Sequence, residues 1–146
     1  MKLDLKNEFA ERAYQILTGL VAPRPIAMVT TLCADGSVSA APISFFKLLD
    51  TGPATCAFAP CDRHDGALKD VEPNVRAIHE FVVDLMDDGD CRGGEPLRRP
   101  YRSVNARWPV QGCMPRPSSM VKPQRIAESP ASLECRGATH CYRFRS

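Results

Sequence analysis

The sequence from residue 22 to residue 46 reads APRPIAMVTTLCADGSVSAAPISFF, and it decides the fold class. Ile26–Leu32 and Val38–Leu49 are rich in apolar and β-branched residues, and the Asp-Gly pair within Ala34–Ser37 is a strong turn signal. The pattern predicts a β-hairpin. Pro42 cannot donate a hydrogen bond within a sheet, so it predicts an edge, a bulge or a point where the backbone leaves the sheet to meet a ligand.

Shorter patterns on both sides of this hairpin predict further elements. Apolar residues recur at spacings of three and four from Glu8 to Leu20, which predicts an amphipathic helix that ends near Thr18-Gly19. The other expected elements are a strand over Thr55–Ala59, a polar loop over Pro60–Gly66, a helix over Leu68–His79, a buried strand over Phe81–Met86 and an ordered segment over Val121–Leu133 with Ile126 and Leu133 buried. We therefore expect a mainly β chain with short helices, either an antiparallel barrel or an α+β fold.

Composition is typical of one soluble domain. The chain has 146 residues, of which 44% are hydrophobic and 25% are charged. No stretch reaches the roughly 20 apolar residues of a membrane-spanning helix, and Met1–Arg12 mixes acids and bases where a signal peptide would be apolar. We expect a cytoplasmic protein with no membrane association. The seven cysteines are odd in number and include no Cys-x-x-Cys pair, so we expect reduced thiols.

Charge divides the chain unequally. Residues 1–90 hold 8 Lys or Arg against 14 Asp or Glu, whereas residues 91–146 hold 11 against 3. A basic segment of this kind can bind nucleic acid. Its seven prolines would interrupt a recognition helix, and it has no aromatic interleaving, zinc-finger spacing or Gly-Arg repeat. We expect no nucleic-acid partner, and a basic interaction protein stays an alternative.

A set of motifs then follows the order found in one known family. The motifs are Ala22–Thr31 with Asp35-Gly36, Ala40–Phe46, Asp65–Asp70 with Asn74–Arg76, His79–Leu85, and Pro117–Pro123 with Arg125–Cys135. Together they resemble the flavin reductase-like family, which has the FMN-binding split barrel. The resemblance covers residues 14–88 and 117–136.

This resemblance implies a six-stranded Greek-key split β-barrel, a homodimer, and FMN held non-covalently in a groove near the subunit interface. It also implies an NAD(P)H-dependent flavin reductase, in which hydride passes from nicotinamide C4 to flavin N5 and a partner such as a flavin-dependent monooxygenase uses the reduced flavin. Because the cofactor carries this chemistry, we expect no catalytic side chain. The chain has no Gly-x-Gly-x-x-Gly motif, so nicotinamide would bind in the open face of the flavin groove.

The resemblance also directs attention to residues that suit a flavin. The ring needs an apolar slot and hydrogen bonds along its pyrimidine edge, and the phosphate needs several donors. The candidates for the ring are the hydroxyl residues Thr30, Thr31 and Ser44, the small residues Ala40 and Ala41, the strand-bending Pro42, and the backbone N–H groups of Ile43, Ser44 and Phe45. Lys69, supported by Arg63 and Ser44, is the candidate for the phosphate, because charge-assisted hydrogen bonds are strong.

Simpler interpretations of these residues stay open. Thr30 and Thr31 can be ordinary strand residues, Lys69 a solvated helix residue, and Arg63 a partner of the acids beside it. A non-enzymatic FMN-binding electron-transfer protein is the alternative to the reductase.

Cysteines and histidines in the middle of the chain allow other chemistry to be considered. Cys56, Cys61 and His64 lie close in sequence, but four ligands at finger-like spacing are missing, so we expect no metal. His64 and His79 are conceivable catalytic acids, and no sequence context activates a thiol as a nucleophile.

Other positions depart from the family pattern. Val71 stands where the family commonly has Thr, which removes an expected phosphate contact, and Asp84 stands where it usually has Asn. An unpaired carboxylate at the end of a buried strand would be costly.

The family pattern is absent from one internal segment and from the end of the chain. Residues 89–116 are irregular, match nothing in the family and resemble a GC-rich coding region translated out of frame. We therefore expect a single domain over residues 1–136, an atypical tail over 137–146, and a truncated, inactive member lacking its last strands as an alternative.

Overall fold

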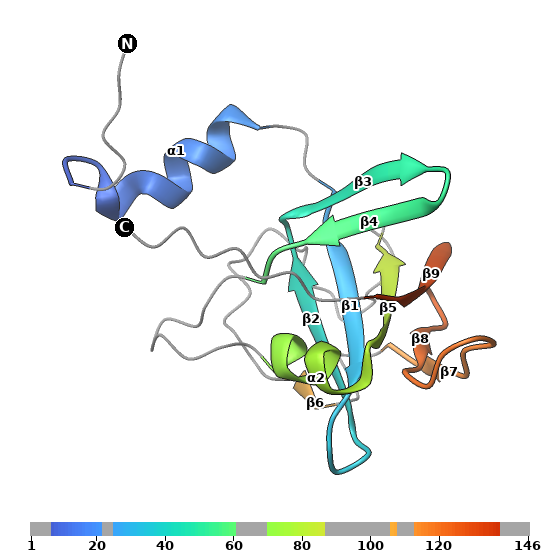
Figure 1. Cartoon of the computed structure of the whole chain (residues 1–146). Coiled ribbons are helices and arrows are strands. Elements are labelled where there is room, and N and C mark those ends of the chain that lie inside the picture. Colours follow the sequence, from blue (N-terminus) through green and yellow to red (C-terminus); the bar gives the residue numbers. More distant parts are fainter. Residues whose placement is uncertain (1–6, 22–24, 61–69, 87–105, 108–112, 138–146) are drawn as a thin grey trace. The chain divides into compact units, whose positions relative to one another are not determined.

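The computed structural model of the chain describes residues 7–21, 25–60, 70–86, 106–107 and 113–137 (Figure 1). The elements in order are η1 (Ala10–Arg12), α1 (Ala13–Leu20), β1 (Ala27–Leu32), β2 (Val38–Ile43), β3 (Phe46–Thr51), β4 (Ala54–Phe58), α2 (Val71–Ile78), β5 (Glu80–Leu85), β6 (Ala106–Arg107), β7 (Pro115–Arg116), β8 (Arg125–Ile126) and β9 (Ala131–Arg136). The chain divides into two compact units, one holding η1 and α1 and the other, over Pro25–Thr139, holding α2 and every strand named above. The prediction of a mainly β fold with short helices is confirmed.

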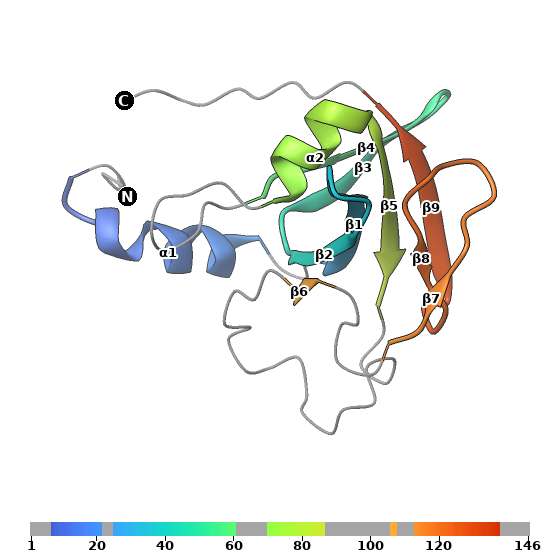
Figure 2. The ribbon, with the colours of Figure 1, turned by 90° about the horizontal axis from the view of Figure 1, so that it is seen from below.

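The largest sheet has five antiparallel strands in the order β6-β2-β1-β5-β9 (Figure 2). β1 is its central strand, because Thr30 pairs with Ala40 of β2 on one side and with Val82 of β5 on the other. Five of the six β1 residues are buried. Since other parts of the chain pack on both faces of the sheet, neither side of β1 faces solvent, and the strand shows no alternation of buried and exposed residues.

The predicted turn is confirmed between β1 and β2. Gly36 has a φ of 81°, and its N–H donates to the carbonyl of Cys33 at 2.9 Å. The Asp35 carboxylate accepts the N–H of Ser37 at 3.0 Å. Glycine adopts this left-handed conformation without steric cost, and the aspartate side chain holds the turn from within.

The prediction of one strand over Val38–Leu49 is wrong. The structure divides this stretch into β2 and β3, with a bend at Ser44 and Phe45, and β3 pairs with β4 in a separate two-stranded sheet. Pro42 supplies the physical reason, since it has no N–H to extend the ladder and β2 ends one residue after it. Of the three alternatives predicted for Pro42, the structure shows the one in which the backbone leaves the sheet, and the contact with a ligand stays a prediction.

The β3–β4 hairpin projects from this bend and is largely exposed. Phe46 at its base is buried, whereas Leu48 and Leu49 are 61% and 60% exposed. A register shift between Leu48 and Asp50 interrupts the ladder. The predicted strand over Thr55–Ala59 corresponds to β4.

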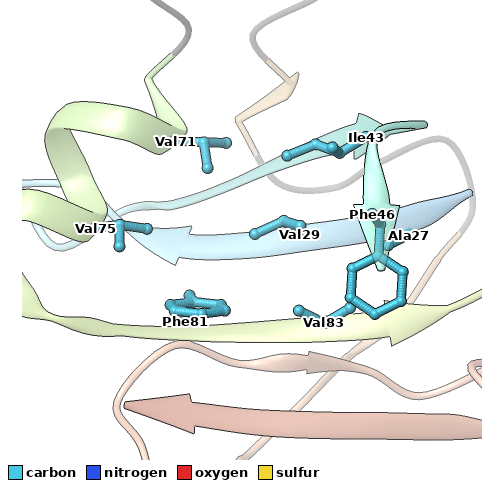
Figure 3. Packing of buried hydrophobic residues seen from close by; sticks show 8 residues of the cluster. All are labelled: Ala27, Val29, Ile43, Phe46, Val71, Val75, Phe81 and Val83. Carbon is cyan, nitrogen blue, oxygen red and sulfur yellow. The ribbon is translucent and has the colours of Figure 1, made fainter. Parts of the chain in front are cut away.

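One face of the five-stranded sheet carries the main apolar cluster, which we call the apolar face. Val71 and Val75 of α2 pack toward the buried residues of the sheet and toward Phe46 of β3 (Figure 3). The cluster consists of Ala27, Val29, Ile43, Phe46, Val71, Val75, Phe81 and Val83. Burial of such side chains contributes about 25 cal/mol per Å² of apolar area, so this cluster should stabilise the fold more than the smaller described cluster on the opposite face.

The opposite face, which we call the polar face, is covered by the segment with β7 and β8. Met28 and Ala40 pack here against Cys113 and Ile126. Thr30 and Asp84 are also fully buried, and the antiparallel register of β1 with β5 places them beside Met28 on the same side. The prediction that Ile126 is buried is confirmed, and Leu133 is half-buried.

Both predicted helices are present, but their ends differ from the predicted ones. The predicted helix over Leu68–His79 is described as α2 from Val71, and His79 ends it with a φ of 57°. The predicted helix from Glu8 to Leu20 corresponds to η1 and α1, but Gly19 lies inside α1 instead of capping it.

The described strands form three antiparallel sheets, and the six-stranded Greek-key barrel stays a prediction beyond them. None of the helices described in this structure is long and apolar enough to cross a membrane.

Candidate functional site

The candidate site is built where β2 ends and the chain bends into β3. Ala41, Pro42, Ser44 and Phe45 are all half-buried. Among the described residues, none forms a hydrogen bond with the hydroxyl of Ser44. The carbonyl of Phe45 accepts the N–H of Ala59 at 2.9 Å, which ties the bend to the end of β4. The backbone therefore holds in place a small, half-buried segment whose serine hydroxyl has no partner within the described ranges.

Thr30 and Thr31 lie on β1 opposite Ala40 and Ser39, away from the bend, and their hydroxyls already have partners. Both side chains are fully buried. Thr30 donates to the carbonyl of Gln124 at 2.6 Å, and Thr31 accepts from the side-chain amide of Asn74 at 3.0 Å. The simpler interpretation, that they are strand residues with structural hydrogen bonds, fits these contacts. Their contact with a flavin stays a prediction.

Ala40 and Ile43 are buried and flank the half-buried Ala41 and Pro42 on β2. Ala40 is 2% exposed and belongs to the polar face, whereas Ile43 is 3% exposed and belongs to the apolar face. A ligand at this strand would reach their backbones and not their side chains. The two phosphate candidates, Arg63 and Lys69, lie outside the described residues, so their role stays a prediction.

Val71 begins α2 and is 1% exposed within the apolar cluster. Its position explains the absence of a hydroxyl, because a Thr here would bury a polar group among apolar neighbours.

Asp84 forms the second notable feature, on the polar face. Its side chain is fully buried, and Oδ1 accepts the hydroxyl of Ser132 at 2.6 Å and the N–H of Ile126 at 3.2 Å. Among the residues that the structure describes, Oδ2 of Asp84 and Nε of Arg125 have no hydrogen-bond partner. Burial raises the pKa of Asp84 to about 6, against the opposing effects of Ser132, the Ile126 N–H and the charge of Arg125. The expected cost of a buried carboxylate at this position is thus visible in its geometry.

Comparison with known proteins assigns the family. The family model described as flavin reductase like domain matches residues 20–141. This chain belongs to the flavin reductase-like family. An uncharacterized protein of Aquifex aeolicus is 31% identical over 136 residues, which are 93% of this chain and 69% of the relative.

Two solved structures share the fold of this flavin reductase-like chain. The nitrilotriacetate monooxygenase component B from Bacillus cereus has a TM-score of 0.74 at 23% identity, and the match covers 93% of this chain and 67% of that one. The 2-nitrobenzoate 2-nitroreductase NbaA of Pseudomonas fluorescens has a TM-score of 0.71 at 26% identity, covering 93% of this chain and 64% of that one. The chain thus spans about two thirds of the length of the proteins it matches.

Family membership implies flavin binding and a flavin-related redox function. The residues at the end of β2 fit such a group, because Ser44 offers a hydroxyl that no other described residue binds and Ala41 has a small side chain beside the backbone. The half-buried Phe45 adds an aromatic side chain at the bend.

His79 has a structural explanation in the flavin reductase-like chain. His79 occupies the left-handed position that ends α2, and its Nδ1 lies 3.3 Å from the carbonyl oxygen of Gly137. Cys61 and His64 of the conceivable zinc set lie outside the described residues. Within the described ranges, three or more metal-ligating side chains do not come together.

Sequence reasoning missed several polar contacts that position these elements. Asn74 of α2 reaches both Thr31 and, at 3.4 Å, the sulfur of Cys33. Glu134 of β9 accepts the N–H groups of Ser119 at 3.0 Å and Met120 at 2.5 Å. The signal for Asn74 was its place within the Asn74–Arg76 motif, whereas the Glu134 contacts join an irregular loop to a strand and leave no periodic pattern.

Proposed function

We propose that this chain binds FMN along Ala41–Phe45 and acts as an NAD(P)H-dependent flavin reductase. The observation that carries the proposal is the half-buried hydroxyl of Ser44, unpaired among the described residues, at the bend where β2 leaves the sheet. The family match over residues 20–141 supports it. The chemistry that FMN supplies when bound is acceptance of a hydride at N5 from nicotinamide C4.

The chain's own residues bind and orient in this proposal. The hydroxyl of Ser44 and the backbone N–H groups of Ile43–Phe45 would donate along the pyrimidine edge of the ring. Because the bend already holds these donors in place, they need not move when the ring binds, and they would stabilise negative charge on that edge of the ring. The bend is pre-formed by Pro42 and by the bond from Ala59 to Phe45. The small side chain of Ala41 would leave the backbone accessible to a flat ring, whereas Ala40 lies on the polar face and packs with Cys113 and Ile126.

The phosphate would be held by Lys69, with Arg63 and Ser44 in support. Charge-assisted hydrogen bonds to phosphate are about twice as strong as neutral ones, so Lys69 would contribute most of the binding free energy at that end. Val71 follows shortly after in the chain and adds no hydroxyl there.

The wider setting belongs to the same proposal. We propose a cytoplasmic homodimer whose reduced flavin is used by a partner enzyme such as a flavin-dependent monooxygenase. The alternative function is a non-enzymatic FMN-binding electron-transfer protein, which the same binding segment would serve equally well. NAD(P)H oxidation by the purified chain with added FMN separates the two, because a carrier binds FMN without oxidising nicotinamide.

A fluorescence titration of the full chain with FMN tests the binding site. We expect saturable quenching for the wild type. Ser44→Ala should weaken binding by about 2–10-fold, because one neutral hydrogen bond is lost, and Lys69→Gln by about 10–100-fold, because a charged partner is lost. Ser119→Ala and Lys122→Gln are the controls, since both positions are exposed and far from β2 in sequence. Saturable binding with equal affinity in all five proteins would place the flavin elsewhere.

A further inference from the structure

Two cysteines from distant parts of the chain meet at the edge of the apolar cluster. Cys56 lies on β4 of the exposed hairpin, and Cys135 lies on β9 at the edge of the five-stranded sheet. Their sulfur atoms are 3.9 Å apart although 79 positions separate them in the chain. Both thiols are free and half-buried, and both pack against the apolar cluster.

We propose that Cys56 and Cys135 form a peroxide-sensitive thiol pair that closes into an intramolecular disulfide. In the first step the sulfur of Cys56 attacks one oxygen of hydrogen peroxide, the O–O bond breaks, and a sulfenic acid and one water molecule are produced. In the second step the sulfur of Cys135 attacks the sulfur of Cys56, the S–O bond breaks, and the leaving hydroxide takes the Cys135 proton to form a second water molecule. Two thiols are oxidised and one peroxide is reduced.

The geometry favours this pairing and this order of attack. A disulfide requires the sulfurs to approach to about 2.05 Å, which side-chain rotation can supply when the atoms already lie at van der Waals distance. Cys135 donates to the carbonyl of Leu133 at 3.4 Å. Burial, with Cys56 beside it, raises the pKa of Cys135 to about 12, so that its thiol stays protonated. Cys56 is therefore the thiol that reacts first, and Cys135 is the resolving one.

The bond would join two sheets that share no strand pairing. β3 and β4 form their own sheet, separate from the five strands that include β9. Apolar contacts such as the edge-to-face pair of Phe58 and Phe81, with ring centroids 5.2 Å apart, connect them. A covalent link across this junction would fix the hairpin that starts at the bend and would restrict the unfolded chain.

Peroxide titration of the reduced full-length chain tests the proposal without any flavin. After treatment with a few equivalents of hydrogen peroxide, remaining thiols are alkylated and the protein is digested with trypsin and chymotrypsin under non-reducing conditions. Trypsin alone leaves Cys56 and Cys61 in one peptide, whereas cleavage after Phe58 separates them. We expect the Cys56–Cys135 peptide as the main cross-linked product, reversible by dithiothreitol, and a rise in Tm on the order of 5 °C or more.

Controls make the result decisive. Cys33→Ser should keep the linked peptide, because Cys33 lies in the β1–β2 turn, whereas Cys56→Ser and Cys135→Ser should lose both the peptide and the rise in Tm. Oxidation in guanidinium chloride should instead give mixed pairings. The proposal is overturned if folded wild type links Cys56 to another cysteine, links two chains into a dimer on a non-reducing gel, or leaves Cys56 and Cys135 open to alkylation while other thiols oxidise. Because peroxide is added directly, these outcomes do not depend on the proposed flavin chemistry.

Discussion

The apolar and polar faces of the five-stranded sheet bury their residues by different chemistry. On the apolar face, Val29, Phe81 and Val83 pack against helix α2 and the β3–β4 hairpin, and the cluster consists of hydrophobic side chains. On the polar face, Thr30 and Asp84 are equally buried but depend on hydrogen bonds to the covering segment. The first face gains from area removed from water, whereas the second gains only when each polar atom has a partner.

Because of this difference, only the polar face should make the stability of the fold depend on pH. Hydrophobic packing changes little with pH, so the apolar face should stabilise the fold similarly from acid to neutral solution. The polar face holds the Asp84 carboxylate, whose Oδ2 has no partner in the described part of the chain, and the contribution of this face to stability should depend on protonation.

Truncation on the apolar face should have the largest effect. Phe81→Ala removes a ring that is 8% exposed and that contacts Phe58, leaving a cavity in the cluster. We expect a loss of about 3–5 kcal/mol in the free energy of unfolding, measured by urea denaturation. Leu48→Ala is the control, because its side chain is 61% exposed and should change stability by no more than about 0.5 kcal/mol. Equal effects of the two substitutions would mean that the hairpin and not the cluster holds the fold.

Neutralising the buried carboxylate should have the next largest effect, and of opposite sign. The pKa of Asp84 is raised from 3.8 to about 6 in the folded chain, so the folded state binds the proton more tightly than the unfolded state. Stability therefore falls as pH rises from about 4 to about 6 and stays low above that window. Asp84→Asn should increase the free energy of unfolding at pH 7 by about 1–3 kcal/mol, because the Asn carbonyl can still accept from Ser132 and Ile126.

The pH dependence distinguishes this cause from a general improvement in packing. The gain of Asp84→Asn over wild type should shrink between pH 6 and pH 4, as wild-type Asp84 becomes protonated. Ser132→Ala should lower stability at neutral pH, because it removes a donor to the charged carboxylate. A gain for Asp84→Asn that is constant across this range would show that the charge is not the source of the cost.

Removing the hydrogen bond of Thr30 should cost less than either change. Thr30→Val keeps the shape of the side chain and deprives the Gln124 carbonyl of its donor, so we expect a loss of about 1 kcal/mol in denaturant unfolding. Thr55→Val is the matched control, because its hydroxyl donates to the carbonyl of Pro53 at an exposed site and should matter less. No difference between the two variants would contradict the idea that the polar face depends on satisfied hydrogen bonds.

The two faces also differ in how far the sequence predicts them. The buried strand over Phe81–Met86 and the Asp35-Gly36 turn follow from local residue patterns, and the structure confirms both. The division of Val38–Leu49 was missed because both halves are apolar, and only the pairing partners show that β3 leaves the sheet. Local patterns predict strands well and say little about which sheet a strand joins.

The sequence predicted where the candidate site lies in the chain better than it predicted which residues its side chains contact. The motif Ala40–Phe46 indicated the bend and its small residues, and Ser44 lies there half-buried. The partners of Thr30 and Thr31 come from Gln124 and Asn74, which are far away in sequence and carry no signal of these contacts. Long-range hydrogen bonds depend on tertiary packing, so a hydroxyl in a motif cannot by itself be assigned to a ligand.

The smallest expected effect concerns a second carboxylate on the same side of the sheet as Asp84. Glu134 lies two residues beyond Ser132 on β9, but it is solvated and its oxygens accept backbone N–H groups of Ser119 and Met120. These hydrogen bonds lower the pKa of Glu134, the opposite direction from Asp84. Its contribution is therefore present above about pH 4.5 and is lost as pH falls.

Glu134→Gln should lower the free energy of unfolding at neutral pH by about 0.5 kcal/mol or less, because solvent screens the charge and the Gln carbonyl can still accept. In acid, both Glu134→Gln and Asp84→Asn should approach the stability of the wild type. Glu134→Gln approaches it from lower stability, and Asp84→Asn from higher stability. Glu8→Gln, at an exposed position in the other compact unit, should show no such trend. If the stability contributions of the two carboxylates change with pH in opposite directions, burial and not the strand or the face sets the sign of the pH dependence. If both contributions change in the same direction, this explanation is contradicted.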